Sequence, residues 1–219
     1  MKTMMFVAMA MSALVLQAGT DPLWDAAEQR AWQSRDLVPE VITTRTEIAD
    51  GDGETLEIID EIERLTGWEA GKPVRKNDSK RTVVHKSGMS VKFNMSSGSN
   101  VFIAAREGRL TRSFVRDEML NGRRCAVYRV EERPAAGKEE KAMAGEVWID
   151  RETSVPVQGV YQPVTMPSNV KSYRMTITYG VTADQWGPQR ASIEAVGGMM
   201  FVKRRLKVEK RFTGWVTAP

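Results

Sequence analysis

The sequence has only one cysteine and one histidine among 219 residues, and each scarcity excludes a kind of site. Cys125 has no second cysteine with which to form an intramolecular disulfide, so the fold must be held together by packing. It lies in the strand-like run RRCAVYRV, without a neighbour that indicates a nucleophile or a metal ligand, so we expect a small buried side chain. Catalytic triads and most zinc sites need histidines that are held by partners. His85 in VVHKSG has no such partner, so we expect a surface or loop position.

Charge of one sign is not concentrated anywhere in the chain, whose net charge is +4. The densest basic run, KRRLKVEKR (203–211), alternates with Leu206 and Val208, as the solvent-facing side of a strand does. Nucleic-acid-binding domains usually concentrate their basic residues in one patch, so nucleic acid is not an expected partner. The sequence also has no Gly-rich phosphate loop between a strand and a helix. Because the paired glutamates 131–132 and 139–140 lie in a polar connector, we predict no catalytic residues, no cofactor and no enzymatic activity.

One acidic stretch, DGDGETLEIIDE, has the spacing of a calcium loop. Its carboxylates fall at positions 1, 3, 5 and 12 of an EF-hand, and they are Asp50, Asp52, Glu54 and Glu61. The sixth position needs glycine for a sharp turn and here holds Thr55. The residues that follow alternate like a strand, which favours a hairpin turn, and no metal site is predicted.

The chain has a single long apolar run, MMFVAMAMSALVL (4–16), which follows Lys2 and precedes the small residues of QAG. This order is typical of a cleaved secretory signal peptide. The alternative is a membrane anchor, but the run would span only about 20 Å as a helix, less than the ~30 Å hydrocarbon core. We therefore predict cleavage after Ala18 and a single soluble periplasmic domain over residues 19–219, without a membrane span. No cysteine near the cleavage site could carry a lipid.

After the apolar run, DPLWDAAEQRAWQSRD predicts a short helix. Asp21 can cap it, Pro22 fits its first position, and an apolar stripe follows on one side. That stripe consists of Leu23, Trp24, Ala27 and Ala31. From Pro39 onward the pattern changes to β.

The rest of the chain predicts about ten to eleven strands joined by short turns. The expected strands are 41–48, 54–65, 89–95, 101–105, 109–115, 123–130, 146–150, 154–161, 170–180, 188–196 and 199–212. Residues 66–80 are expected to form a loop, 131–145 a charged connector, and Gly197-Gly198 a two-residue turn. Short links favour antiparallel neighbours. The predicted fold is mainly β, with a few helices: a strongly curved antiparallel sheet or barrel behind an N-terminal helix.

Alternation along the strands predicts one apolar and one wet face of the sheet. The apolar face of the two most regular strands consists of Tyr173, Met175, Ile177 and Tyr179, and of Met200, Val202, Leu206 and Val208. In the hairpin GEVWIDRETSVPVQGVY, Val147 and Ile149 point to one face of the strand and Trp148 to the other. We therefore expect apolar side chains on both faces of this hairpin. Pro156 is expected at a strand start or an unpaired edge position.

Several of these stretches resemble the LolA/LolB-like family of periplasmic, outer-membrane lipoprotein-sorting proteins. They are DEMLNGRRCAVYRVEERP (117–134), GEVWIDRETSVPVQGVY (145–161), NVKSYRMTITYG (169–180) and FVKRRLKVEKRFTGW (201–215). The resemblance extends over roughly residues 40 to 215.

The resemblance implies a half-open β-barrel whose mouth is covered by helices and whose apolar cavity accepts an acyl chain. It thus predicts an exported, non-catalytic carrier of a lipid or lipoprotein acyl chain. The predicted ligand-binding residues are Tyr173, Met175, Ile177, Tyr179, Met200, Val202, Leu206 and Val208, with the helix around Trp24 as a lid. Unbranched methionine side chains adapt well to varied chains, but the same residues could equally be ordinary core. The alternative function is an envelope protein-interaction or stress-sensing module that binds another protein with the same fold.

Overall fold

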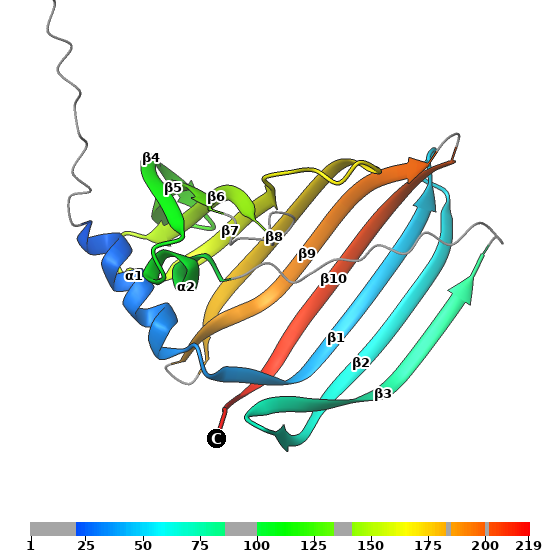
Figure 1. Cartoon of the computed structure of the whole chain (residues 1–219), viewed down its shortest axis with the longest axis horizontal. Helices are drawn as coiled ribbons and strands as arrows, with labels where there is room; N and C mark the ends of the chain where they lie inside the picture. The colour runs from blue at the N-terminus through cyan, green and yellow to red at the C-terminus, as the bar shows by residue number, and fades with distance from the viewer. Residues whose placement is uncertain (1–20, 86–99, 134–141, 183–184, 200–201) are drawn as a thin grey trace, which may run out of the picture.

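The computed structural model describes residues 21–85, 100–133, 142–182, 185–199 and 202–219, and Figure 1 shows their arrangement. The helices are α1 (Pro22–Gln33) and α2 (Val101–Arg106). The strands are β1 (Leu37–Asp50), β2 (Thr55–Glu69), β3 (Lys72–Val84), β4 (Leu110–Leu120), β5 (Arg123–Glu132), β6 (Met143–Asp150), β7 (Pro156–Pro163), β8 (Val170–Thr182), β9 (Gln185–Met199) and β10 (Val202–Thr217).

All ten strands belong to one open antiparallel sheet, in the order β3-β2-β1-β10-β9-β8-β7-β6-β5-β4. The predictions of a mainly β fold, of about ten antiparallel strands and of an N-terminal helix are confirmed. The order departs from a simple meander at one point: β3 and β4 are consecutive in sequence but form the two opposite edges. The first and last strands pair in the middle, with Ile48 opposite Leu206 and Thr46 opposite Val208.

α1 forms where its end signals predict it. One oxygen of the Asp21 carboxylate accepts hydrogen bonds from the backbone N–H groups of Leu23 and Trp24, each at 3.2 Å. These donors have no partner inside the helix, so the carboxylate satisfies them. Trp24, Ala27 and Ala31 are buried on the side that faces the sheet.

α2 corrects the prediction of a strand over residues 101–105. Asn100 caps this helix by accepting a hydrogen bond from the N–H of Phe102 at 3.1 Å. Val101, Phe102 and Ala104 are all buried. A short continuous apolar run is compatible with a buried strand and with a buried helix. The spacing of apolar residues therefore could not distinguish the two structures here. The strand expected over 89–95 lies outside the described residues.

Two further predictions about turns were wrong. Residues 66–80 form no loop, because β2 continues to Glu69 and β3 begins at Lys72 after a tight turn with positive φ at Ala70 and Gly71. β3 has polar residues on both faces because it is an edge strand, where charge discourages pairing with another chain. Gly197 and Gly198 lie within β9 and pair with β10. A side chain at Gly198 would overlap the Val202 carbonyl, so the close backbone approach explains this glycine.

The main core lies between the two helices and one face of the sheet. α1 contacts both β6 and β9, which are three strands apart, so the sheet curves around the helix. A smaller apolar cluster lies on the opposite face and contains Cys125, Val127, Trp148 and Val157. Val147 and Ile149 belong to the main core and Trp148 to the smaller cluster, so the predicted division of this hairpin is confirmed.

Other local predictions are also confirmed. Cys125 is fully buried, and His85 is exposed. Pro156 is the first residue of β7. The acidic stretch after Asp50 is a hairpin turn, in which the Asp50 carboxylate accepts hydrogen bonds from the backbone N–H groups of residues 52–54. Within the described ranges, neither helix is long and apolar enough to cross a membrane.

Candidate functional site

The predicted ligand-binding residues divide between the filled core and its border. Met175, Tyr179, Leu206 and Val208 are buried in the main core, together with Trp24 of the predicted lid. Tyr173 and Ile177 are partly buried and pack against that core. Val202 is half-buried at the start of β10, and Met200 lies outside the described residues.

Aromatic rings fill the space between α1 and the sheet. Trp24 packs against Phe102 of α2 with ring centroids 5.1 Å apart, and against Tyr128 of β5 edge to face at 5.2 Å. Phe102 meets Trp186 at 5.8 Å, and Trp186 stacks on Tyr179 at 4.7 Å. The rings thus form a continuous chain from the helices to β8 and β9. Phe102 and Trp186 could not be predicted as core residues, because neither lies in a run with clear alternation.

Two tyrosine hydroxyls meet inside this core. The oxygens of Tyr161 and Tyr179 are 3.4 Å apart. Burial raises the pKa of Tyr179 to about 12. Burial also raises the pKa of Tyr161 well above its ordinary value, and the neighbouring Tyr179 adds to the shift. Both hydroxyls therefore stay neutral at physiological pH and act as packing groups.

An apolar stripe leads from the core to the strands that the helices leave uncovered. Figure 1 shows α1 and α2 over the β4–β9 side of the sheet, whereas β10, β1, β2 and β3 extend away from them. On the core-facing side, Leu206 is opposite Ile48, and Thr46 is opposite Ile59 of β2. The stripe ends at the exposed ion pair between Glu61 and Lys80, whose charged atoms are 2.9 Å apart.

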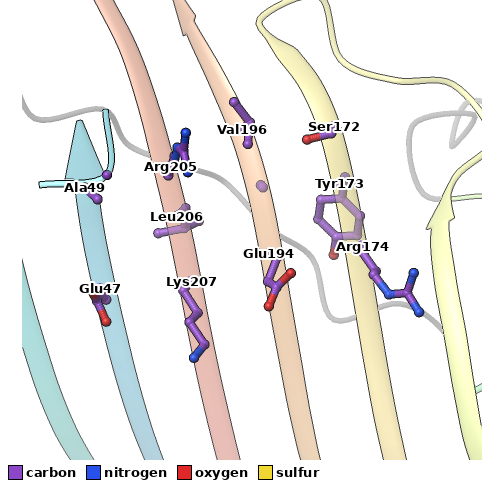
Figure 2. Close-up of a pocket in the computed structure, with 12 residues that line it drawn as sticks. Glu47, Ala49, Ser172, Tyr173, Arg174, Glu194, Val196, Arg205, Leu206 and Lys207 are labelled. Atoms are coloured by element: carbon purple, nitrogen blue, oxygen red, sulfur yellow. The ribbon is translucent and has the colours of Figure 1, made fainter. Parts of the chain in front are cut away.

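The opposite face of the sheet has two adjoining hollows. The first, of about 410 Å³, crosses β1, β10, β9 and β8. Figure 2 shows a row of alternating charges on these strands, formed by Glu47, Lys207, Glu194 and Arg174. The second hollow, of about 350 Å³, lies between β6, β7 and the start of β8. Tyr173 and Arg174 line both.

The walls of the second hollow combine apolar side chains with one ion-paired glutamate. Trp148 and Val160 line it from the smaller apolar cluster. Glu146 also lines it, and both of its oxygens accept hydrogen bonds from Arg116, at 3.1 and 3.0 Å. These bonds raise the pKa of Arg116, whose guanidinium lies 5.9 Å from the centre of the Trp148 ring. No His, Cys, Asp and Glu side chains in the described ranges are grouped to hold a metal ion.

The chain folds as an open antiparallel sheet with two helices packed on one face. The sequence matches no protein-family model and no curated protein. A Vibrio parahaemolyticus domain, provisionally described as an outer membrane lipoprotein-sorting protein, is similar with a TM-score of 0.43 and 11% identity, over 89% of this chain and 91% of that chain. A DUF1329 family protein from Desulfovibrio piger has a TM-score of 0.38 and 14% identity, over 88% and 94% of the two chains.

A chain of the Pseudomonas aeruginosa MucA/MucB complex has a TM-score of 0.26 and 10% identity, over 90% of this chain and 99% of that chain. What this chain binds is argued below from its own surfaces.

Proposed function

We propose that the protein is an exported, non-catalytic carrier that binds a lipid or the acyl chain of a lipoprotein on the core-facing side of its sheet. In this proposal residues 1–18 are a cleaved signal peptide, and residues 19–219 form one periplasmic domain. The observation that carries it is the apolar stripe, which runs from beneath α1 through Leu206 to Ile48 and Ile59 on the uncovered strands.

α1 is the proposed cover of the binding surface. It rests on the sheet through Trp24, Ala27 and Ala31, and its outer side is held by the Arg112–Asp25 ion pair at 3.1 Å. Movement of α1 would expose its buried side together with the parts of β6 and β9 that it contacts. The loss of a buried tryptophan's contacts costs about 3–5 kcal/mol, and each buried methylene contributes about 0.8 kcal/mol. About six methylenes of an acyl chain would therefore offset the opening of α1.

Lipid analysis of the protein purified from its native periplasm tests this function. We expect lipid mass spectrometry to find a bound acyl lipid, and the emptied protein to take up a fluorescent acyl probe. Trp24→Ala should change probe binding, because it removes the side chain that seats α1. Trp32→Ala is the matched control, since Trp32 lies on the same helix outside the core. Repeated purification without lipid, together with no probe uptake, would contradict the carrier function.

A protein partner is the second candidate, and the filled aromatic core favours it. In the part of the chain that the structure describes, rings occupy the space where a ligand would enter, from Trp24 to Tyr179. A partner would instead cover the half-buried Ile48 and Ile59 without moving α1. Crosslinking in the periplasm, followed by affinity purification, should then recover one stoichiometric protein partner. Recovery of bound lipid and no such partner would exclude this second candidate.

A further inference from the structure

The strands β7 and β8 pair only over a short distance. Their ladder joins Gln158–Tyr161 to Met175–Thr178, whereas β8 already begins at Val170 and pairs with β9 from there. Tyr173 and Arg174 therefore have no paired strand on the β7 side. This notch in the sheet is where the two hollows of the helix-free face meet.

The second hollow has an apolar wall with one unused hydrogen-bond donor. Trp148 is only 7% exposed, and its indole N–H is buried without an acceptor in the described ranges. Most buried donors in folded proteins are paired, and an unpaired one carries a desolvation cost. Val127 and Val157 pack with Trp148 in the smaller cluster, and the Arg116 guanidinium lies 5.9 Å from the centre of the Trp148 ring.

The charges around the notch favour an anion. Glu146 is ion-paired with Arg116, which also binds Glu118 at 2.7 Å. Arg174 lines both hollows and makes no ion pair or hydrogen bond with the described chain. Its cross-strand neighbour is Glu194, which lines the first hollow. Among the described residues that line the second hollow, Arg174 is the unpaired cation, and the carboxylate of Glu146 is paired with Arg116. Glu194 competes for Arg174 from the neighbouring strand.

We propose that the two hollows form one binding site for a single-chain amphiphile with an anionic headgroup. The alkyl chain lies against Trp148 and Val160 in the notch, and the carboxylate or phosphate oxygens bind Arg174. Each hollow falls within the ~300–1,000 Å³ of ordinary small-molecule sites. The charged residues of this site lie on the face opposite α1, and the first hollow shares Tyr173 and Leu206 with the acyl-binding surface proposed above.

Indole N–H signals in a ¹H–¹⁵N NMR spectrum test this site directly. The probes are decanoate and decyl phosphate below their critical micelle concentrations, with decanol and inorganic phosphate as single-feature controls. We expect both anionic amphiphiles to shift the Trp148 signal, which is identified by its loss in Trp148→Phe. The Trp24 and Trp186 signals report separately on the surface beneath α1. Decanoate and decyl phosphate distinguish a fatty-acid from a phosphate headgroup by their relative affinities.

Different results separate this proposal from the carrier function. If the probes shift Trp24 and Trp186 but leave Trp148 unchanged, the chain binds beneath α1 and the proposed outer site is wrong. If inorganic phosphate alone shifts Trp148 equally, the site binds free anions and the amphiphile assignment is overturned. If only Trp148 shifts, the outer site exists and the carrier function beneath α1 fails.

Charge variants supply the second test. Arg174→Gln should weaken decanoate binding about tenfold or more, the usual effect of losing a charge-assisted hydrogen bond. Glu194→Gln should tighten binding, because it removes the competing carboxylate. Arg45→Gln is the matched control, since Arg45 lies on the same face, pairs with Asp60 and lines neither hollow. Equal effects of Arg174→Gln and Arg45→Gln, or no gain with Glu194→Gln, would overturn the assignment.

Discussion

The phenol of Tyr128 on β5 donates a hydrogen bond to one carboxylate oxygen of Asp21 at 2.8 Å. The other oxygen of the same carboxylate caps α1. One acidic side chain therefore both begins the helix and ties it to the sheet. Burial, followed by the hydrogen bond and charge of Asp21, raises the pKa of the Tyr128 phenol.

Tyr128→Phe should destabilise the protein by about 1–3 kcal/mol, since a hydrogen bond to a charged group is lost while the ring remains. The measurement is the free energy of unfolding in urea. Tyr173→Phe is the control, because that hydroxyl contacts only the sulfur of Met175, at 4.0 Å. Equal losses in the two variants would show that the Tyr128 bond does not anchor α1.

Trp24→Ala should cost about 3–5 kcal/mol, as expected for a fully buried aromatic side chain that leaves a cavity. Trp32→Ala should cost less, about 1–2 kcal/mol, because Trp32 only lies between the guanidinium groups of Arg35 and Arg106, at 4.4 and 4.5 Å. Chemical denaturation of both variants measures the difference. A larger loss for Trp32→Ala would contradict the packing described for α1.

Asp150→Asn should lower stability at neutral pH and flatten its dependence on acid. Burial of Asp150 by itself raises the pKa of the carboxyl, but hydrogen bonds from Glu152 and Thr153, aided by Arg123, outweigh it and lower the pKa. The stabilisation is therefore complete above the ordinary aspartate pKa of ~3.9 and is lost as the pH falls through the lowered value.

The stability gap between the native protein and Asp150→Asn should thus narrow as the pH falls below about 4. Melting temperatures measured from pH 7 to pH 2 give this gap. Asp60→Asn is the control, because Asp60 forms only an exposed pair with Arg45 at 3.4 Å. A gap that stays constant with pH would refute the proposed role of the Asp150 carboxylate.

All four tyrosines should resist alkaline titration in the folded protein. Burial is the main cause that raises the pKa of each of them: Tyr128, Tyr161, Tyr173 and Tyr179. A raised folded pKa stabilises the protein below the ordinary value of ~10, and that stabilisation is lost as the pH rises further. Absorbance of tyrosinate should therefore appear together with unfolding seen by circular dichroism. Tyrosinate forming near pH 10 in the folded protein would contradict this.

Gly145→Ala should destabilise the sheet and disturb the second hollow. A side chain at this position would overlap the backbone carbonyl of Val160 on the neighbouring strand, so β6 and β7 would have to separate. Gly67→Ala is the matched control, because nothing lies within 4 Å of an added side chain there. We expect a loss of about 1–3 kcal/mol at Gly145 and almost none at Gly67, measured by urea unfolding. Similar values for both would show that the approach of the two strands is not restrictive.

Local signals were sufficient for the parts of the fold whose physics is local. The cap at Asp21 and the stripe of Trp24 and Ala27 correctly predicted α1. The two-residue period correctly divided Val147 and Ile149 from Trp148. The spacing of apolar residues could not identify α2, because burial on several sides of this helix removes the alternation. It could not identify β3 either, because this edge strand is polar on both faces.

The candidate sites were less predictable than the strands. The sequence placed Met175, Tyr179, Leu206 and Val208 on one apolar face, but it gave no sign that Phe102 and Trp186 fill the space above them. The outer hollows could not be predicted from the sequence either. A charged strand face such as that around Arg174 has the same pattern as an ordinary solvent-exposed face.

Local patterns were enough to predict where α1 begins and which side of the regular strands is apolar, because pleat period and helix capping act between near neighbours. The pairing of β1 with β10, and the parting of β8 from β7 after Tyr161, became known from the fold. Strand partners and register depend on packing between distant segments. This long-range pairing brings Arg174 of β8 and Trp148 of β6 to the walls of one hollow.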